Sequence, residues 1–416
     1  MDPSVREMQR ARIAVSVLFF VNALTLSAWL PRLAEIQIDL ALSDFDIGLA
    51  LTAGAVGGVA AGILAGPLIG RFGSNSVAVL SLVAILPVLP MIGLAGGLWA
   101  FAFVLLVVGA LDAVMDAAMN SHAMRVQHGV RRSILNTFHG YWSLGTVAGG
   151  LIGVGTAAIG LPLAWSLTLV SVLCAVSVLG TRRWLLAGKD PESFLAEDTP
   201  PGAEHDVERI ESANADPSSF LTPPPTVAAS RRVIARPIIW ALGVFIILAV
   251  MIEDIPGRWS SIYLTEIGTP ERFVGWGYVA FSVAMTAGRF LGDRIVDAIG
   301  ERTWTRIAMT ATALTLGGSL IIGSAWAFII GCAVAGFGVA TLFPAAMRAV
   351  AHLPGIKPAT GVSTLSWLSR AGFVVAPLAV GAIADGIGIA WGIGIAVLAA
   401  AALLPLSAVL KSAKSR

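Results

Sequence analysis

Three polar residues follow one another at spacings of four within a long apolar run: Asp112, Asp116 and Asn120. In an α-helix this spacing places them on one face. A charged side chain is costly within a membrane, so it usually faces the protein interior and marks a path for substrate or protons. We expect Asp112 and Asp116 to bind and release a proton. The alternative is a carboxylate that an arginine neutralises or that a neighbouring helix binds through a hydrogen bond.

The next apolar run begins with a polar stripe beside an aromatic ring. Asn136, His139 and Ser143 are spaced three and four residues apart, and Trp142 lies next to them. Such a stripe can bind hydroxyl groups, and a histidine can relay protons near neutral pH. We therefore predict that Asn136, His139 and Trp142 bind substrate; the alternative for His139 is a bond to one backbone carbonyl. Asn22 is the polar candidate in the first apolar run.

Charged residues recur in the second half of the chain. Glu253, Asp254 and Arg258 lie within one apolar run, and the pair Pro256-Gly257 separates the acids from the base. This pair predicts a break in the helix and a gating bend, because free backbone groups are tolerated only beside protein or a water-filled cavity. Glu253 and Asp254 are further candidate proton sites, and Arg258 is a candidate substrate ligand. Alternatively, an acid pairs with Arg258 only to neutralise its charge.

Arg370 lies inside a later apolar run, close to Trp367. It can bind an anionic group of a substrate or pair with an acid, although long arginine side chains also reach from helix ends to the membrane surface. Many of the twelve tryptophans lie at the ends of runs, as interfacial belts require. Trp142, Trp259 and Trp367 remain as candidates for contact with a solute.

The elements that must position these residues are membrane helices. The chain of 416 residues is 56% hydrophobic and only 12% charged, whereas a soluble domain has about 25% charged residues. Its apolar runs are about 20 residues long, enough to cross a bilayer as helix. The predicted fold class is an all-α membrane protein with twelve transmembrane helices, over residues 13–33, 46–69, 76–96, 98–124, 134–159, 161–180, 234–264, 272–296, 304–323, 325–348, 358–384 and 388–410.

Two halves of six helices each flank a polar segment. We predict an N-terminal bundle over residues 1–184, a linker over 185–231 and a C-terminal bundle over 232–416. Between Ala187 and Ser230 the chain has nine acids and two bases, a net charge of −7, and many prolines. Such a segment cannot bury enough apolar surface to offset the entropy lost on ordering, so the linker is expected to be mostly disordered.

The distribution of charge predicts orientation and excludes several classes of protein. With the N-terminus inside the cell, 23 of the 27 basic residues lie on the cytoplasmic side, so both termini are expected there. The net charge of +2 gives no reason to expect a nucleic-acid partner. Cys174 and Cys332 lie in apolar runs without metal-ligand spacing, and we expect neither a disulfide, a metal nor a cofactor. The apolar run from Ile13 has no convincing cleavage site, which favours a retained first helix.

Two six-helix halves joined by a long cytoplasmic loop resemble the major facilitator superfamily, whose bundles alternate access to a site at the membrane midplane. The segment Gly66–Gly73 is similar to that superfamily's Gly-x-Leu-x-Asp-Arg-x-Gly signature, with glycine in place of the acid. The segment Gly288–Gly300 is the corresponding loop of the second half and keeps its acids. The resemblance implies that Arg71, Asp293 and Arg294 belong to latches that are made and broken during transport.

Glycine recurs at strict intervals in two of the predicted helices. It occupies positions 54, 58, 62, 66 and 70 in the second and positions 145, 149 and 153 in the fifth. Such faces let helix backbones approach closely. They predict either static packing or a surface on which helices slide.

Two segments resemble the fucose-permease-like sugar:proton symporters and their uncharacterised bacterial inner-membrane relatives. By position, Asp116 and Asn120 match an acid and an asparagine of those proteins, and His139 falls where the permease has a substrate-binding asparagine. The resemblance implies that Asp116 carries protons and that Asn120 and His139 contact substrate. Asn22 lies in the span where the permease has a second protonatable residue, and the segment around Trp259 is similar to a Glu-Gly-x-x-x-Asp-Trp-Ser motif of the relatives. The resemblance further implies a monomer in the bacterial cytoplasmic membrane.

Three classes of function remain. The sequence favours proton-coupled transport of a small polar, sugar-like solute. The alternative is efflux of drugs or metabolites by proton antiport, although Leu105 stands four residues before Gly109 where that branch has an arginine. A membrane enzyme or a receptor without transport has no motif in its favour.

Overall fold

A computed structural model describes residues 3–130, 134–188, 226–353, 356 and 358–410. Within these residues the secondary structure is helical, without a strand. The longer helices are α1 (Pro3–Ser27), α3 (Asp44–Phe72), α4 (Ser74–Val88), α5 (Leu98–Val130), α6 (Leu135–Ala158), α7 (Leu163–Thr181), α10 (Thr226–Glu266), α12 (Trp276–Ile299), α13 (Glu301–Ile322), α14 (Ala325–Val339), α15 (Leu342–Ala351), α16 (Pro358–Ile387) and α17 (Ile389–Leu406). Short helices connect them: η1 (Leu30–Arg32), α2 (Leu33–Asp39), η2 (Leu89–Leu94), η3 (Arg182–Trp184), α11 (Glu271–Val274) and η4 (Ser407–Val409).

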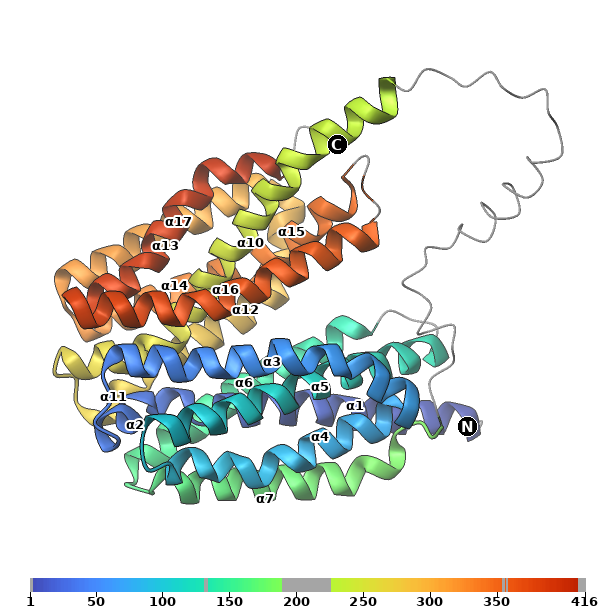
Figure 1. Cartoon of the computed structure of the whole chain (residues 1–416), viewed down its shortest axis with the longest axis horizontal. Coiled ribbons are helices and arrows are strands. Elements are labelled where there is room, and N and C mark those ends of the chain that lie inside the picture. The colour runs from blue at the N-terminus through green and yellow to red at the C-terminus, as the bar shows by residue number, and fades with distance from the viewer. Residues whose placement is uncertain (1–2, 131–133, 189–225, 354–355, 357, 411–416) are drawn as a thin grey trace.

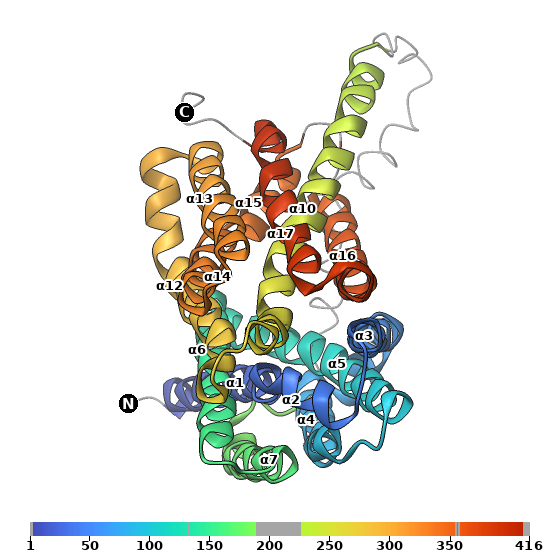
Figure 2. The same ribbon diagram turned by 90° about the vertical axis from the view of Figure 1, so that its left-hand side faces the viewer.

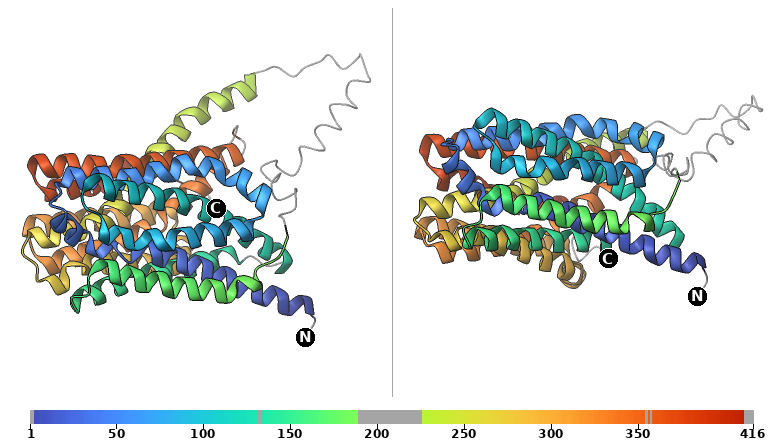
Figure 3. Two further views of the ribbon diagram at one scale, coloured as in Figure 1. Left: turned by 60° about the horizontal axis from the view of Figure 1, so that its bottom comes forward. Right: turned by 90° about the horizontal axis from the view of Figure 1, so that it is seen from below.

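The helices form two bundles that lie against each other, α1 to α7 in one and α10 to α17 in the other (Figure 1). Counted with α14 and α15 as one broken crossing, they give the twelve membrane crossings that the sequence predicts, and the all-α fold class is confirmed. Viewed along the helices, the N-terminal bundle meets the C-terminal bundle mainly through α3, which contacts α16, and α6, which contacts α12 (Figure 2). The first turns of α1 and α10 extend beyond the other helices at one end of the molecule (Figure 3).

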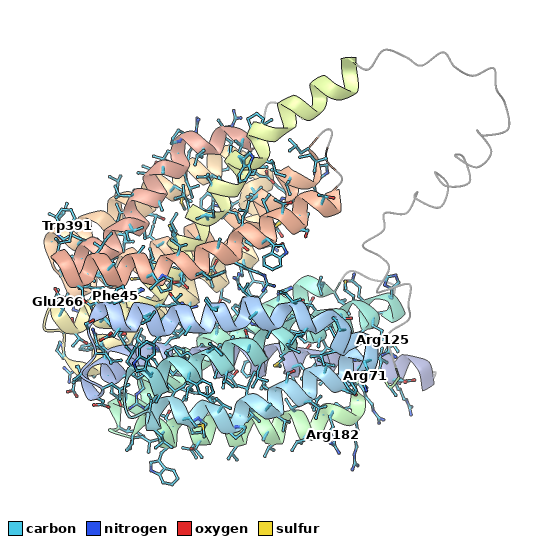
Figure 4. The ribbon with its side chains drawn as sticks, viewed as in Figure 1. Phe45, Arg71, Arg125, Arg182, Glu266 and Trp391 are labelled. Atoms are coloured by element: carbon cyan, nitrogen blue, oxygen red, sulfur yellow. The ribbon has the colours of Figure 1, made fainter. Side chains whose placement is uncertain are left out.

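Side chains mark the two ends of the molecule. Arg71, Arg125 and Arg182 gather at the end from which the N-terminus projects, whereas Phe45 and Glu266 lie at the opposite end (Figure 4). We refer to these as the arginine-rich end and the opposite end. The unequal distribution of arginine is the pattern that predicts which end faces the cytoplasm.

Corresponding loops of the two bundles have the same backbone conformation. Gly73, between α3 and α4, has φ 81° and ψ 148°, and Gly300, between α12 and α13, has φ 85° and ψ 149°. Positive φ favours glycine because it has no Cβ. The glycine that ends each signature loop therefore has a backbone role, independent of the charged residues before it.

Ten helical segments of the described chain are long and apolar enough to cross a membrane by themselves. The helices α6 and α12 do not meet this criterion, although they run beside the others. They contact each other between the two bundles. One face of each helix therefore lies against the other bundle, where lipid does not cover it.

The predicted break at Pro256-Gly257 is wrong. Helix α10 continues from Thr226 to Glu266 with Pro237 and Pro256 inside it. Proline removes one N–H donor from a helix, but membrane helices tolerate this where neighbours support the freed backbone. Pro256 and Gly257 are both buried, and the ring of Phe281 in α12 lies 3.9 Å from the position of a Cβ at Gly257. Packing against α12 therefore outweighs the local preference for a break.

The predicted linker, residues 185–231, lies only partly within the described chain. Helix α10 begins at Thr226, and residues 185–188 continue from the end of the N-terminal bundle, with Leu185 and Leu186 buried. The remaining residues, 189–225, lie outside the described part. The boundaries of the two halves stay a prediction.

Both glycine-rich faces contain close helix packing within the N-terminal bundle. A Cβ at Gly145 would lie 2.1 Å from the carbonyl oxygen of Phe20, and one at Gly153 would lie 2.5 Å from that of Ala28. These contacts bring α6 against α1. Gly54 likewise contacts α5, since a Cβ at Gly109 would lie 2.0 Å from its carbonyl oxygen. These glycines therefore form packing surfaces in this conformation, and whether the helices slide on them stays a prediction.

We expect Gly145→Ala to destabilise the protein. The added methyl group must displace α1, and overpacking of this kind costs about 1–3 kcal/mol. Gly155→Ala is the matched control on the same helix, because a Cβ there meets nothing within 4 Å and alanine favours the helical state. Thermal unfolding of the purified variants in detergent measures the difference. Equal midpoints for the two variants would contradict the packing assignment.

Candidate functional site

The helices of the N-terminal bundle hold a chain of hydrogen bonds at membrane depth. Asn22 of α1 donates from Nδ2 to Oδ1 of Asp112 in α5, at 2.6 Å. Trp142 of α6 donates from Nε1 to Oδ1 of Asn22, at 2.9 Å. Asn22 is 1% exposed, and both ends of its amide are therefore fixed by partners. The carboxylate of Asp112 therefore accepts a hydrogen bond from a neighbouring helix, which is the alternative to a proton site that the sequence left open.

Arg289 of α12 extends this chain into the C-terminal bundle. Its guanidinium lies 5.4 Å from the centre of the Trp142 ring, a cation–π distance. It also donates from Nη1 to Oγ of Ser143, at 2.9 Å, and lies 3.8 Å from Oε1 of Glu253 in α10. Polar contacts thus run from Asp112 in one bundle to Glu253 in the other.

Asp254 and Arg258 form an ion pair within α10. Asp254 is buried, and its second oxygen, Oδ2, has no hydrogen-bond partner among the described residues. This is the neutralising pair that the sequence offers as the alternative to a proton site. Trp259 is fully buried and its Nε1 is also without a partner in that part of the chain, so this conformation does not expose it to a solute.

A second group of predicted residues remains accessible. Asn120 donates from Nδ2 to Oδ1 of Asp116, at 3.1 Å, and both side chains belong to an exposed contact. Asp116 interacts electrostatically with Arg370 of α16, in the other bundle. Arg370 lies over Trp367, at 5.9 Å, and its Nη1 is 3.3 Å from the position of a Cβ at Gly62 of α3. These four side chains therefore lie between the bundles, accessible to a solute.

The structure locates the side chain of His139 but does not describe that of Asn136. The His139 ring packs edge-on against Phe19, with ring centres 5.3 Å apart, and it interacts electrostatically with Arg289. Asn136 belongs to α6, but its side chain lies outside the described set. The structure thus places His139 beside the Arg289 contacts and leaves the prediction for Asn136 as it stands.

The predicted latch residues lie at the arginine-rich end. Arg71 is exposed and lies over the ring of Phe72, at 5.3 Å. Asp293 and Arg294 are also exposed, and neither forms an ion pair with another residue that the structure describes. Their gating role stays a prediction.

Sequence reasoning missed Arg289. The sequence places Arg289 among the bases of a cytoplasmic loop. In the structure α12 continues to Ile299, and Arg289 lies about 20 Å along this helix from Trp276, at 1.5 Å per residue. Glu253 lies at a similar distance from the end of α10. A base within a helical run, eleven residues before the glycine that ends the run, is the signal that could have found it.

The bundles contact each other at and near the opposite end. The backbone N–H of Asp44 donates to Oδ1 of Asp385, at 3.1 Å, and a Cβ at Gly48 would lie 2.4 Å from the carbonyl oxygen of Pro377. Helices α3 and α16 therefore touch through their backbones. Toward the arginine-rich end the ribbons of the two bundles diverge (Figure 1).

The described residues contain no group of three or more His, Cys, Asp or Glu that could hold a metal ion. The accessible polar site lies between two bundles of membrane helices, and each bundle contributes one helical face to it. A site between two such bundles is the architecture of an integral membrane transporter.

The chain belongs to the Major Facilitator Superfamily, which it matches over residues 15–268 and 255–415. It is similar to an uncharacterised MFS-type transporter of Yersinia pestis, with 26% identity over 92% of this chain and 90% of that protein. It is also similar to the membrane protein MosC of Rhizobium meliloti, with 27% identity over 90% of this chain and 84% of that protein.

Solved structures share the fold at low sequence identity. The nucleoside transporter NupG has a TM-score of 0.70 and 13% identity, over 95% of this chain and 97% of its own. A D-xylose-proton symporter has a TM-score of 0.69 and 13% identity, over 99% of both chains. These similarities establish the arrangement of the helices.

The hydrogen bond between Trp142 and Asn22 gives a test of the polar chain. We expect the variants Asn22→Leu and Trp142→Phe to be non-additive in the free energy of unfolding, by about 0.5–1.5 kcal/mol, because each removes the same bond. A denaturant titration of the single and double variants in mixed micelles measures this coupling.

Trp165→Phe provides the control, since Trp165 is 64% exposed on α7. Combined with Asn22→Leu, it should give additive effects. Additivity for Trp142→Phe as well would show that the bond contributes nothing.

Proposed function

We propose that this protein is a proton-coupled transporter of a small polar, sugar-like solute, which works by alternating access. The observation that carries the proposal is the accessible group Asp116, Asn120, Trp367 and Arg370, drawn from one helix of each bundle. A carboxylate, an amide and a guanidinium offer hydrogen bonds to hydroxyl groups, and a tryptophan ring offers a flat apolar surface. Ligand sites of transporters with repeated halves lie between those halves.

Asp116 is the proposed proton carrier. Its carboxylate has one hydrogen-bond donor from its own helix and a positive charge in the other bundle, whereas Asp112 is held by Asn22. A group whose environment changes when the bundles move is the one that can bind a proton on one side and release it on the other. Asp112, Glu253 and Asp254 are the other candidates, each with a fixed partner nearby.

The orientation that we propose places the arginine-rich end in the cytoplasm of a bacterial cell, in its inner membrane, with both termini on that side. The bundles then meet on the outer side, through α3 and α16, and diverge toward the cytoplasm. The conformation described here is accordingly inward-facing. In this orientation Asp116 and Arg370 are accessible from the cytoplasm.

Known transporters with this fold support the choice of solute. One of the two solved structures is a nucleoside transporter and the other is a D-xylose-proton symporter. Both solutes carry several hydroxyl groups. The residues between the bundles of this chain suit the same chemistry.

The first test is proton uptake by vesicles that contain the purified protein, challenged with a panel of sugars, nucleosides and sugar acids. We expect uptake with at least one solute, and its loss in Asp116→Asn, because the amide cannot bind the proton at this position. Asp39→Asn is the matched control, a carboxylate-to-amide change at the exposed last residue of α2, outside the polar site.

Two outcomes would contradict the proposal in different ways. Solute-driven proton uptake that persists in Asp116→Asn would move the proton site to another acid. No response to the whole panel, together with proton-driven expulsion of hydrophobic dyes, would replace solute uptake with the alternative of antiport efflux.

A further inference from the structure

Arg289 is the residue through which charged and aromatic groups of both bundles meet. Its contacts to Ser143 and Trp142 cross from α12 to α6, that is, from the C-terminal to the N-terminal bundle. Its contact to Glu253 stays within the C-terminal bundle, between α12 and α10. One guanidinium is thus shared between an interaction that joins the bundles and one that does not.

The two sets of contacts are in competition. The distance from Arg289 to Glu253, 3.8 Å, is within ion-pair range but too long for a hydrogen bond, whereas the bond to Ser143 is 2.9 Å. In this conformation the arginine is therefore engaged chiefly by α6. A charged Glu253 draws the guanidinium toward α10, and a neutral Glu253 leaves it on Ser143 and Trp142.

We propose that Arg289 is a positioning residue that couples the charge on Glu253 to the contact between the two bundles. Loss of the charge on Glu253 by protonation favours the conformation described here. A charged Glu253 weakens the hold of Arg289 on α6 and favours the alternate one. This proposal rests on the proposed function, since it assigns to that transport cycle the step that links a proton to movement.

Few other charges act on this pair. Glu253 interacts with Asp254 and Arg258 on its own helix as well as with Arg289 of α12. On the side of α6, His139 interacts with Arg289. Since Asp254 and Arg258 neutralise each other, the net local field at Glu253 comes mainly from Arg289.

The neighbouring contacts explain why the effect reaches the whole bundle. Thr286 lies one turn before Arg289 on α12. Its hydroxyl donates to the backbone oxygen of Ser282 at 2.8 Å and lies 3.4 Å from that of Ser143 in α6. The ring of Phe290 lies 3.2 Å from the position of a Cβ at Gly140 of α6. Arg289 therefore belongs to the contact surface between α12 and α6, where these helices must separate or slide when the bundles move.

The test measures the distance between the bundles directly. Spin labels are placed on Gly180→Cys of α7 and Ala298→Cys of α12, both exposed near the arginine-rich end, in a background in which the buried Cys174 and Cys332 are replaced by alanine. A Cβ at Gly180 meets nothing within 4 Å. Distances are recorded in nanodiscs from pH 5 to pH 9, without solute.

We expect the labels of the otherwise unaltered protein to favour the longer distance at low pH. Glu253→Gln should hold the longer distance at every pH. Arg289→Gln should favour the shorter distance and change the population ratio on the order of tenfold, the effect of one charge-assisted hydrogen bond. Addition of Glu253→Gln to Arg289→Gln should have no further effect, because the carboxylate acts through the arginine.

Controls separate this role from a merely structural one. Arg183→Gln, an exposed arginine beyond α7, should leave the pH dependence unchanged. Arg289→Lys keeps the charge and should retain a weaker pH dependence, which provides a second reading if Arg289→Gln does not fold. The proposal is overturned if Arg289→Gln, or Arg289→Lys in its place, has the pH dependence of the parent protein, or if Glu253→Gln acts equally with and without Arg289.

Failure of this proposal is distinct from failure of the proposed function. The distances need no solute, so they report on Arg289 even if the vesicles respond to none of the solutes tested. The converse result is solute-driven proton uptake that depends on Asp116 while the label distances do not change with substitution of Arg289. This result would support the proposed transport function and reject the coupling role of Arg289.

Discussion

The cost of an unpartnered charge in a membrane is the constraint on which this structure depends. Removal of an ionised side chain from water is unfavourable by several kcal/mol unless a partner compensates. The described chain meets this constraint by bringing its intramembrane charges to the boundary between two bundles or into a pair on one helix. Asp112 is bonded by Asn22, Asp254 is paired with Arg258, and Glu253 faces Arg289. Because several of these partners lie on different helices, the same requirement that stabilises the charges also fixes which helices are neighbours.

Close backbone packing supplies the rigid part of the molecule. Glycine brings α6 onto α1 and α3 onto α5 within the N-terminal bundle, at distances that no larger residue permits. A comparable approach occurs between the bundles, where Gly48 of α3 meets Pro377 of α16 near the opposite end. Tight packing inside a bundle makes it move as a unit. Contacts between bundles at one end, with divergence at the other, are the arrangement that rocking of such units produces.

The fold could be predicted from the sequence because it depends on local properties. Apolar runs of membrane-spanning length and the repeated signature loops are sufficient for twelve helices in two halves, and Gly73 and Gly300 indeed have matching backbone angles. Which residues of two helices meet depends on how deep each residue lies in the membrane and on how each helix is rotated about its axis. The sequence pattern specifies neither. Thus Arg289 was assigned to a loop, although α12 carries it into the membrane, and Pro256 was expected to interrupt α10, although packing against Phe281 keeps that helix intact.

The predicted site residues divide into two groups by what holds them. Asp112 and Asp254 each have a partner at hydrogen-bond distance and Glu253 faces Arg289 at 3.8 Å, whereas the exposed Asp116 and the half-buried Asn120 bond to each other. A solute can displace water from the second group without breaking a contact between helices, whereas binding to Asp112 or Asp254 requires replacing a present partner. On the proposed mechanism this division separates recognition from movement: the exposed pair binds, and the partnered acids change the contacts between the bundles. Arg289 belongs to the first group, because Ser143, Trp142 and Glu253 hold it where the bundles meet. Asp116 of the second group faces Arg370 of the other bundle, and for that reason occupancy of the site and position of the bundles can depend on each other.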